Sequence, residues 1–358
     1  MKSSPARAIS RRATESVRFS ARIATLAFFL VAALLVSSSA RAQDNPPPPP
    51  GAKPSELFNG GQQPQKPQQS PPGATLKKDV NLVVLHATVD DSKGQFVPDL
   101  KQNDFKVFED KVEQQISVFT REDIPVSVGL VIDNSGSMRE KRSQVNSAAL
   151  TFVKTSNPQD EVFVVNFNDD YYLDLDRDFT SDPKELQEAL ERIDSRGSTA
   201  LYDAVVGSLD HLKKAHKDKR VLLIVTDGDD DASRKTFEYT IKAAQQSNAL
   251  IYAVGVFSDY DQSHDKRMVR HSKKILTELA ESTGGAAYFP NSLDEVQPIC
   301  TTIAHDIRNQ YTLGYYPTNT ANNGSFRAVQ VLVNAKGHGK LSVRTRTGYF
   351  AKGGTGAK

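Results

Sequence analysis

Residues 124–138 read "IPVSVGLVIDNSGSM", an apolar run that ends in one carboxylate and two hydroxyls at alternate positions. A continuous apolar run of this kind is typical of a strand that is buried on both faces of a parallel sheet. Asp133, Ser135 and Ser137 then lie immediately beyond the carboxyl end of that strand. The stretch therefore predicts a buried central strand that leads directly into a polar loop.

The same pattern recurs through residues 124–298, where apolar runs alternate with amphipathic stretches. The other predicted strands cover 161–167, 220–226 and 249–256, with an edge strand at 285–290. The predicted helices cover 138–155, 183–193, 200–215, 233–247 and 266–282. Apolar strands separated by helices indicate βα units. We therefore expect an α/β fold with a doubly wound, Rossmann-like and mostly parallel sheet that is covered on both faces.

Segments rich in predicted strands flank this region on both sides. Alternating apolar and polar residues predict short strands within 81–119 and, after a helix at 293–309, in 310–316, 326–333 and 341–350. Isolated hairpins are marginally stable in water, so we expect the two flanks to pair into one small β-domain. The expected parts are an N-terminal β segment (77–122), a domain at 123–298, a C-terminal helix end and β segment (299–351), and a tail (352–358).

Residues 1–42 have the features of a signal peptide, with basic residues, the apolar run 23–36, and Ala40 and Ala42 in A-x-A spacing. We expect cleavage near Ala42 and a mature protein in the periplasm or outside the cell, without stable membrane insertion. An uncleaved N-terminal anchor is the alternative, although the apolar run is shorter than the roughly 20 residues of a usual span. Residues 43–76 are rich in Pro, Gln and Gly, which predicts a disordered linker.

The composition argues against several classes of function. The 45 Lys and Arg nearly balance the 43 Asp and Glu, so nothing indicates a nucleic-acid partner. The single cysteine, Cys300, can form neither an intrachain disulfide nor a zinc cluster of several thiolates. No motif pairs a histidine with Ser135 or Ser137, and no Gly-rich phosphate loop is present. We therefore expect no enzyme, no catalytic residue and no organic cofactor.

Two further loops bring polar residues to the same edge of the predicted sheet. Thr199 lies in "RGSTALYDA" (196–204), and Asp227 directly follows "RVLLIVT" (220–226). Ligands in such sheets bind beyond the carboxyl ends of the strands, so we expect these residues to converge with those of "DNSGSM". The set offers only hard oxygen donors, which suit Mg²⁺ first, with Mn²⁺ or Ca²⁺ as alternatives, rather than zinc. The predicted metal ligands are Asp133, Ser135, Ser137, Thr199 and Asp227.

"DNSGSM", "GST" and "TDG", in this order and spacing, resemble the metal-ion-dependent adhesion site of von Willebrand factor type A domains. The resemblance covers about 124–298, and the ligands named above fill every position of the family's pattern. It implies a domain that binds a divalent cation and captures an acidic side chain of a protein partner. The flanks, including "VPDLKQNDFKVFEDKVEQQISVF" and "QYTLGYYP", resemble a secreted bacterial family related to von Willebrand factor type A proteins and abundant in acidobacteria.

Other interpretations of these motifs stay open. "DNSGSM" alone is compatible with a helix N-cap. The metal can also be purely structural, with assembly through the β flanks, and a metal-dependent hydrolase is a further alternative. "DGDDDASRKTFE" (227–238) has acids at EF-hand-like spacing, but Ala232 replaces the required glycine and a strand precedes the loop. Chelation that abolishes partner binding without unfolding the protein would separate adhesion from the structural alternative.

Overall fold

The computed structural model describes residues 81–353, except 122, 193–194 and 229. All of them belong to one compact unit, Ala74–Lys358. The predicted signal peptide (1–42) and linker (43–76) lie outside the described residues, as does most of the predicted tail. Within the described part of the chain, no helix is both long and apolar enough to cross a membrane.

The centre of the fold is a six-stranded sheet in the order β10-β9-β8-β5-β6-β7. Its strands are β5 (Val126–Asp133), β6 (Glu161–Phe167), β7 (Tyr171–Leu173), β8 (Lys219–Thr226), β9 (Leu250–Gly255) and β10 (Ala287–Tyr288). All neighbouring pairs are parallel except β6 and β7. The predicted α/β fold with a mostly parallel sheet is therefore confirmed, and β5 is buried at every position as its apolar run indicates.

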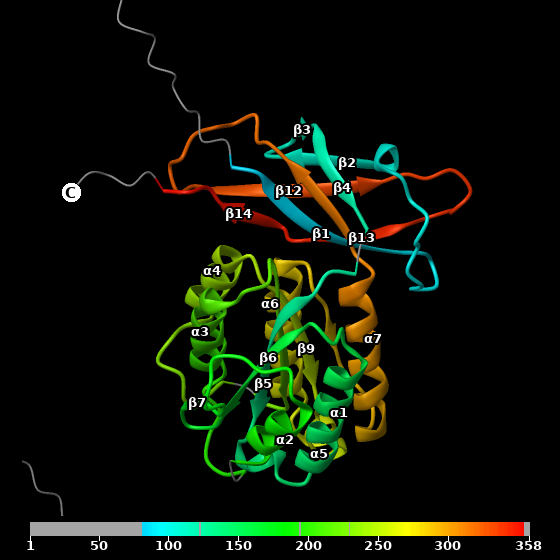
Figure 1. Ribbon diagram of the computed structural model, residues 1–358. Coiled ribbons are helices and arrows are strands. Elements are labelled where there is room, and N and C mark those ends of the chain that lie inside the picture. The colour runs from blue at the N-terminus through cyan, green and yellow to red at the C-terminus, as the bar shows by residue number, and fades with distance from the viewer. Residues whose placement is uncertain (1–80, 122, 193–194, 229, 354–358) are drawn as a thin grey trace, which may run out of the picture. The chain divides into compact units, whose positions relative to one another are not determined.

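Helices cover both faces of this sheet (Figure 1). Leu130 and Ile132 of β5 contribute to one core, while Val131 contributes to the other. The first core contains residues of α1 (Arg142–Thr155), α2 (Pro183–Glu191) and α7 (Val296–Arg308), including the buried Cys300. The second core contains residues of α3 (Leu201–His211), α4 (Phe237–Ser247) and α6 (Lys266–Thr283). This alternation of side chains explains why the central strand reads as continuously apolar.

Several helix ends differ from the predicted ones for local reasons. A 3₁₀ turn at Gly136–Met138 follows β5, so α1 begins at Arg142 instead of 138. Helix α4 begins at Phe237 instead of 233, because the Thr236 hydroxyl caps it by accepting from the N–H of Tyr239. Two elements were not predicted, β7 and the short helix α5 (Asp259–His264). The boundary expected after residue 298 falls inside α7.

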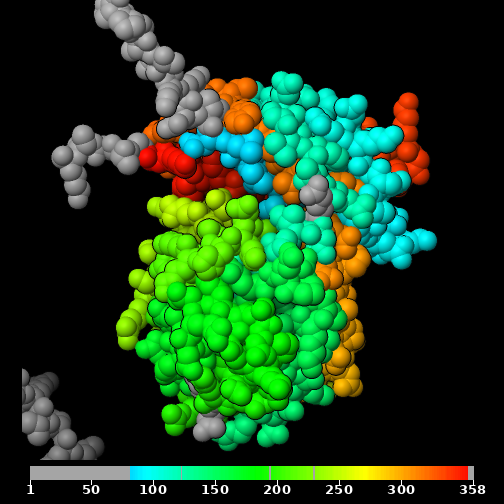
Figure 2. Space-filling model, viewed as in Figure 1, coloured from blue at the N-terminus to red at the C-terminus, as the bar shows by residue number. Residues whose placement is uncertain are grey.

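The flanks form two four-stranded antiparallel sheets, ordered β13-β1-β11-β4 and β14-β12-β2-β3. Their strands are β1 (Val83–Asp90), β2 (Phe105–Glu109), β3 (Val112–Gln114), β4 (Ile116–Thr120), β11 (Tyr311–Tyr315), β12 (Phe326–Val333), β13 (Ser342–Arg344) and β14 (Gly348–Phe350). Because β1 pairs with both β11 and β13, N-terminal and C-terminal segments interleave (Figure 1). The same interleaving appears at the surface, where cyan, orange and red residues adjoin (Figure 2). The predicted β-domain built from both flanks is confirmed.

Polar contacts join these sheets to the α/β part of the same unit. The side-chain amide of Gln310 donates to the hydroxyls of Thr88, at 3.0 Å, and of Tyr252, at 3.4 Å. Arg344 of β13 donates to the carboxylate of Asp306 in α7, at 2.8 Å. The β-sheets and the α/β part are therefore joined by buried hydrogen bonds and an ion pair as well as by the continuous polypeptide.

His86 of β1 lies at this junction and makes the stability of the protein sensitive to acid. Burial, followed by the nearby charges of Lys219 and Arg346, lowers the pKa of His86 from 6.5 to about 3. The unfolded chain therefore binds a proton between these pH values that the folded chain does not bind. The stability from this group is present above pH 6.5 and is lost as the pH falls toward the folded pKa.

We expect the free energy of unfolding to fall by roughly 1–2 kcal/mol more in wild type than in His86→Gln between pH 7 and pH 5. Urea unfolding at both pH values measures the difference. His264→Gln serves as a control, because that histidine lies on the exposed helix α5. An equal loss of stability in wild type and His86→Gln would show that His86 does not carry the effect.

Candidate metal centre

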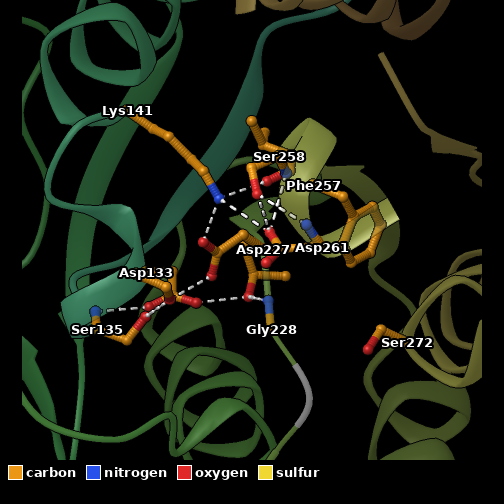
Figure 3. A network of polar contacts seen from close by, with 12 residues as sticks. Asp133, Ser135, Lys141, Asp227, Gly228, Phe257, Ser258, Asp261 and Ser272 are labelled. Carbon is orange, nitrogen blue, oxygen red and sulfur yellow. Dashed lines mark hydrogen bonds and ion pairs between the residues drawn. The ribbon is translucent and has the colours of Figure 1, made fainter. Parts of the chain in front are cut away.

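The predicted ligands lie where strands β5 and β8 leave the sheet. Asp133 is the last residue of β5, and Asp227 directly follows β8. The two strands are parallel neighbours, so their carboxyl ends share one edge of the sheet. Thr199 lies in the loop that leads into α3. Figure 3 shows Asp133 and Asp227 on adjacent elements, with Asp133 hydrogen-bonded to Ser135 and Asp227 paired with Lys141.

Asp133 is completely buried and is held by two hydrogen bonds. Its Oδ1 accepts from the N–H of Ser135 at 2.7 Å, and its Oδ2 accepts from the hydroxyl of Thr226 at 2.6 Å. Burial, followed by the charge of Asp227, raises the pKa of Asp133 to about 6. Burial disfavours the charged form, and so does the neighbouring carboxylate. The site therefore concentrates negative charge at a point that bulk water does not screen.

Two serines connect the pair of carboxylates. The hydroxyls of Ser135 and Ser137 lie 3.1 Å apart, and the Ser137 hydroxyl donates to Oδ1 of Asp227 at 2.9 Å. Asp133, Ser135, Ser137 and Asp227 thus form a continuous set of oxygen donors. The N-cap alternative is not what the structure shows, because Ser135 precedes the 3₁₀ turn without a side-chain capping bond.

Thr199 lies beside this set without a hydrogen bond between its hydroxyl and the other four residues in the described structure. Its N–H donates to Oδ1 of Asp231 at 2.7 Å, and its carbonyl accepts from the N–H of Asp231 at 3.1 Å. A Cβ added to Gly228 would lie 3.3 Å from the Thr199 hydroxyl. The Thr199 loop therefore packs against the turn that follows Asp227, and glycine permits this close approach.

The acidic loop after Asp227 serves local structure. Asp230 accepts from the hydroxyl of Ser233 at 2.5 Å and from the N–H of Tyr202 at 2.9 Å. Asp231 accepts from the N–H of Thr199, as described above. Both carboxylates therefore order the loops around the candidate centre. Among the residues that the structure describes, no cluster of three or more His, Cys, Asp or Glu side chains is placed to hold a metal ion.

Lys141 was not predicted as part of this region. Its side chain is 8% exposed, and its ammonium group forms an ion pair with Oδ2 of Asp227. The same group donates to the carbonyl of Val256 at 3.0 Å and lies 3.9 Å from Oδ2 of Asp261 (Figure 3). In the sequence it stands between other basic residues, "REKR", and only its spacing of four after Ser137 could have indicated its place.

A second, half-buried cation contacts the main chain of Asp133. Arg142 donates to the backbone carbonyl of Asp133 at 3.4 Å and to that of Leu190 at 2.6 Å. Burial lowers the pKa of Arg142 to about 10. Both of these hydrogen bonds go to main-chain carbonyls, so Arg142 holds the loop in place without bonding to the carboxylate oxygen atoms of the site.

The donor set fits a hard divalent cation. The two carboxylates supply two negative charges, and the hydroxyls supply neutral oxygen atoms. Mg²⁺ prefers such oxygen ligands and usually retains water molecules in the remaining positions. Burial, followed by the charge of Asp227, raises the pKa of Asp133, and a nearby cation would favour its charged form. The site residues predicted from the sequence thus lie together, while their role as ligands stays a prediction.

The comparisons with known proteins agree with this fold. A family model described as von Willebrand factor type A domain matches residues 128–229. No curated protein shows significant sequence similarity to the chain. The narrower resemblance of the flanks to a secreted bacterial branch stays a prediction.

Three solved structures are similar to parts of the chain. A von Willebrand factor type A protein from Catenulispora acidiphila is 12% identical, covers 75% of this chain and 74% of its own, and has a TM-score of 0.44. The conserved hypothetical protein BatB from Bacteroides thetaiotaomicron is 18% identical, with 51% and 100% coverage and a TM-score of 0.40. Proximal thread matrix protein 1 from the mussel byssus, with a zinc-occupied MIDAS motif, is 17% identical, with 56% and 49% coverage and a TM-score of 0.42.

With TM-scores no higher than 0.44, these three similarities support no conclusion about ligand or activity. The family model and the observed sheet are sufficient for the assignment of the fold. Its match includes Asp133, Ser135, Ser137, Thr199 and Asp227. Residues 128–229 therefore match the family model of the von Willebrand factor type A domain, and the mostly parallel sheet covered by helices agrees with that match.

Proposed function

We propose that this domain binds a divalent cation, Mg²⁺ by preference, and uses it to capture an acidic side chain of a protein partner. The observation that carries the proposal is the pair of buried carboxylates, Asp133 and Asp227, joined through two serine hydroxyls at the end of the sheet. Two carboxylates clustered in a buried position favour a cation between them, because a cation relieves both their desolvation and their repulsion.

Each proposed ligand has a role that follows from its chemistry. Asp133 and Asp227 supply the charge, and Ser135, Ser137 and Thr199 supply neutral oxygen atoms, directly or through water. A bound cation would present a positively charged position to an incoming carboxylate. The two carboxylates balance a divalent cation, and Lys141 adds a further positive charge beside Asp227. A carboxylate from outside would therefore complete the neutralisation of the site.

The proposed setting of this binding is the periplasm or the cell exterior, after removal of residues 1–42. A purely structural metal with assembly through the β flanks is the second candidate, since the two flanks interleave in their own sheets. The Ser137 hydroxyl donates to Asp227, and that carboxylate is already engaged in an ion pair with Lys141, which disfavours a hydrolase with a serine nucleophile. We therefore propose a binding module without enzymatic activity.

Metal binding should stabilise the folded protein. A ligand that binds only the folded state at a hundredfold excess over its Kd adds about 2.7 kcal/mol. For a domain of this size we expect millimolar Mg²⁺ or Mn²⁺ to raise the Tm by roughly 5–10 °C, and EDTA to reverse the change. Asp133→Asn should abolish the shift, because it removes one of two ligand charges at nearly constant shape.

Differential scanning fluorimetry and calorimetry measure the shift and the Kd. Asp210→Asn is the matched control, because the Asp210 side chain is 64% exposed on helix α3 and pairs only with Lys213 in the described structure. Equal cation affinity in wild type and Asp133→Asn would refute the site assignment.

Capture of a partner should depend on both the cation and the acid. We expect immobilised protein to retain peptides that present a single Asp or Glu in millimolar Mg²⁺, and to lose them in EDTA. Peptides with Asn or Gln at the same position should not bind, because an amide lacks the charge that the cation attracts. Circular dichroism in EDTA checks that the fold persists; retention of acidic peptides in EDTA would contradict a metal-bridged mechanism.

A further inference from the structure

The ammonium group of Lys141 stands at the candidate metal centre in the position of a counter-ion. It is paired with Oδ2 of Asp227, while Oδ1 of the same carboxylate accepts from Ser137. Both oxygen atoms of Asp227 are therefore satisfied before any metal arrives. Figure 3 shows the lysine side chain reaching from the start of α1 toward the end of β8.

The burial of this pair shows that the ammonium group is an integral part of the site. The side chains of Lys141 and Asp227 are 8% and 1% exposed. A buried charge is tolerated when it is paired and hydrogen-bonded, and Lys141 also donates to the carbonyl of Val256. A protonated amine has no lone pair, so Lys141 cannot itself ligate a metal ion.

The positive charge of Lys141 reduces the net negative charge that the site offers to a cation. Asp133 and Asp227 together carry two negative charges. Lys141 carries one positive charge in the same buried region and balances one of them. A divalent cation must therefore bind close to a fixed positive charge and must draw on a carboxylate that already has a partner. Both effects weaken cation binding, because the repulsion is poorly screened in a buried site.

Lys141 also lies close to a carboxylate of helix α5, in addition to its ion pair with Asp227. Its ammonium group lies 3.9 Å from Oδ2 of Asp261. That oxygen accepts from both the N–H and the hydroxyl of Ser258. The Ser258 hydroxyl in turn accepts from the N–H of Asp261, which completes the capping box of α5. Lys141 thus has a second acidic neighbour and a carbonyl partner that remain in place when a cation competes for Asp227.

We propose that Lys141 is an internal counter-cation that sets the affinity of the metal site, keeping the metal-free domain stable and the bound ion exchangeable. This inference rests on the proposed function, because it concerns the same site. Lys141 acts through Asp227 and is a positioning residue; it is not a ligand. Arg142 is unsuited to this role, since it donates to the main-chain carbonyls of Asp133 and Leu190.

The test compares Lys141→Met, Lys141→Gln and Lys141→Arg with wild type in the full chain. Calorimetry with Mn²⁺ and Mg²⁺ gives the Kd, and thermal melts in EDTA and at saturating cation give the stability of both states. Lys154→Met is the matched control, because Lys154 lies on the same helix and is exposed.

We expect the Kd of Lys141→Met to be about tenfold lower than that of wild type, since the competing charge is gone. Its Tm in EDTA should fall below wild type, and the cation should restore most of the loss. Lys141→Gln, which can still donate to the carbonyl of Val256, should show the same tighter binding and replaces Lys141→Met where that variant fails to fold. Lys141→Arg and Lys154→Met should leave the Kd within about threefold of wild type.

The possible results distinguish the counter-cation role of Lys141 from the proposed metal site itself. An unchanged or higher Kd in both neutral variants, with a lower Tm in both states, would overturn the counter-cation role and leave the proposed metal site standing. Absence of cation binding in wild type and in every variant would overturn the proposed function together with this inference.

Discussion

Two carboxylates buried at the ends of adjacent parallel strands are the constraint around which this site is built. Asp133 is fully buried and Asp227 nearly so. Such a pair is costly, because burial removes water and each charge disfavours the other. The two carboxylates accept hydrogen bonds from nearby groups, including the Thr226 hydroxyl, the Ser135 N–H and the Ser137 hydroxyl. Lys141 adds the one positive charge that touches a carboxylate directly.

The sheet determines why the polar residues appear where they do. Every residue of β5 is buried, since helices cover both faces of the strand. The close packing around β5 also requires a glycine at position 129, because a Cβ there would collide with the side chains of Phe163 and Leu222. The one charged side chain of β5, Asp133, stands where the strand leaves the sheet. The site is thus a consequence of the fold as much as of the motif.

Sequence patterns predicted the elements whose signals are local. The strands β5 and β8 follow from apolar runs, and α2 follows from Asp182 and Pro183, whose cap is present as a hydrogen bond from the N–H of Lys184. Strand β7 has only three residues and exists through pairing with β6, so it leaves no periodic pattern. Helix α5 did leave a signal that was overlooked, the capping box formed by Ser258 and Asp261.

The candidate site divides in the same way. The five predicted ligands could be named from motif spacing, because parallel strands share an edge. Lys141 could not be found so, because a basic residue at a helix start usually faces solvent. Only tertiary packing distinguishes it from its neighbour Arg139, which is exposed. A pattern of residue types therefore indicates ligands that follow strands at a fixed spacing. It does not indicate a charged residue whose role depends on being buried in the folded protein.

The arrangement of the flanks gives the site its orientation within the unit. Strand β4 ends at Thr120 and β11 begins at Tyr311, and the two pair in register at Thr120 and Thr312. The α/β part thus connects to the β-sheets through two neighbouring segments. Strand β5 starts on that side and carries Asp133 at its far end, seven residues later. At about 3.3 Å per residue, the strand separates the candidate centre from the connection by roughly 23 Å. A metal at that end would be presented away from the interleaved sheets, which is the placement that partner capture requires and that a metal serving assembly through the flanks would not need.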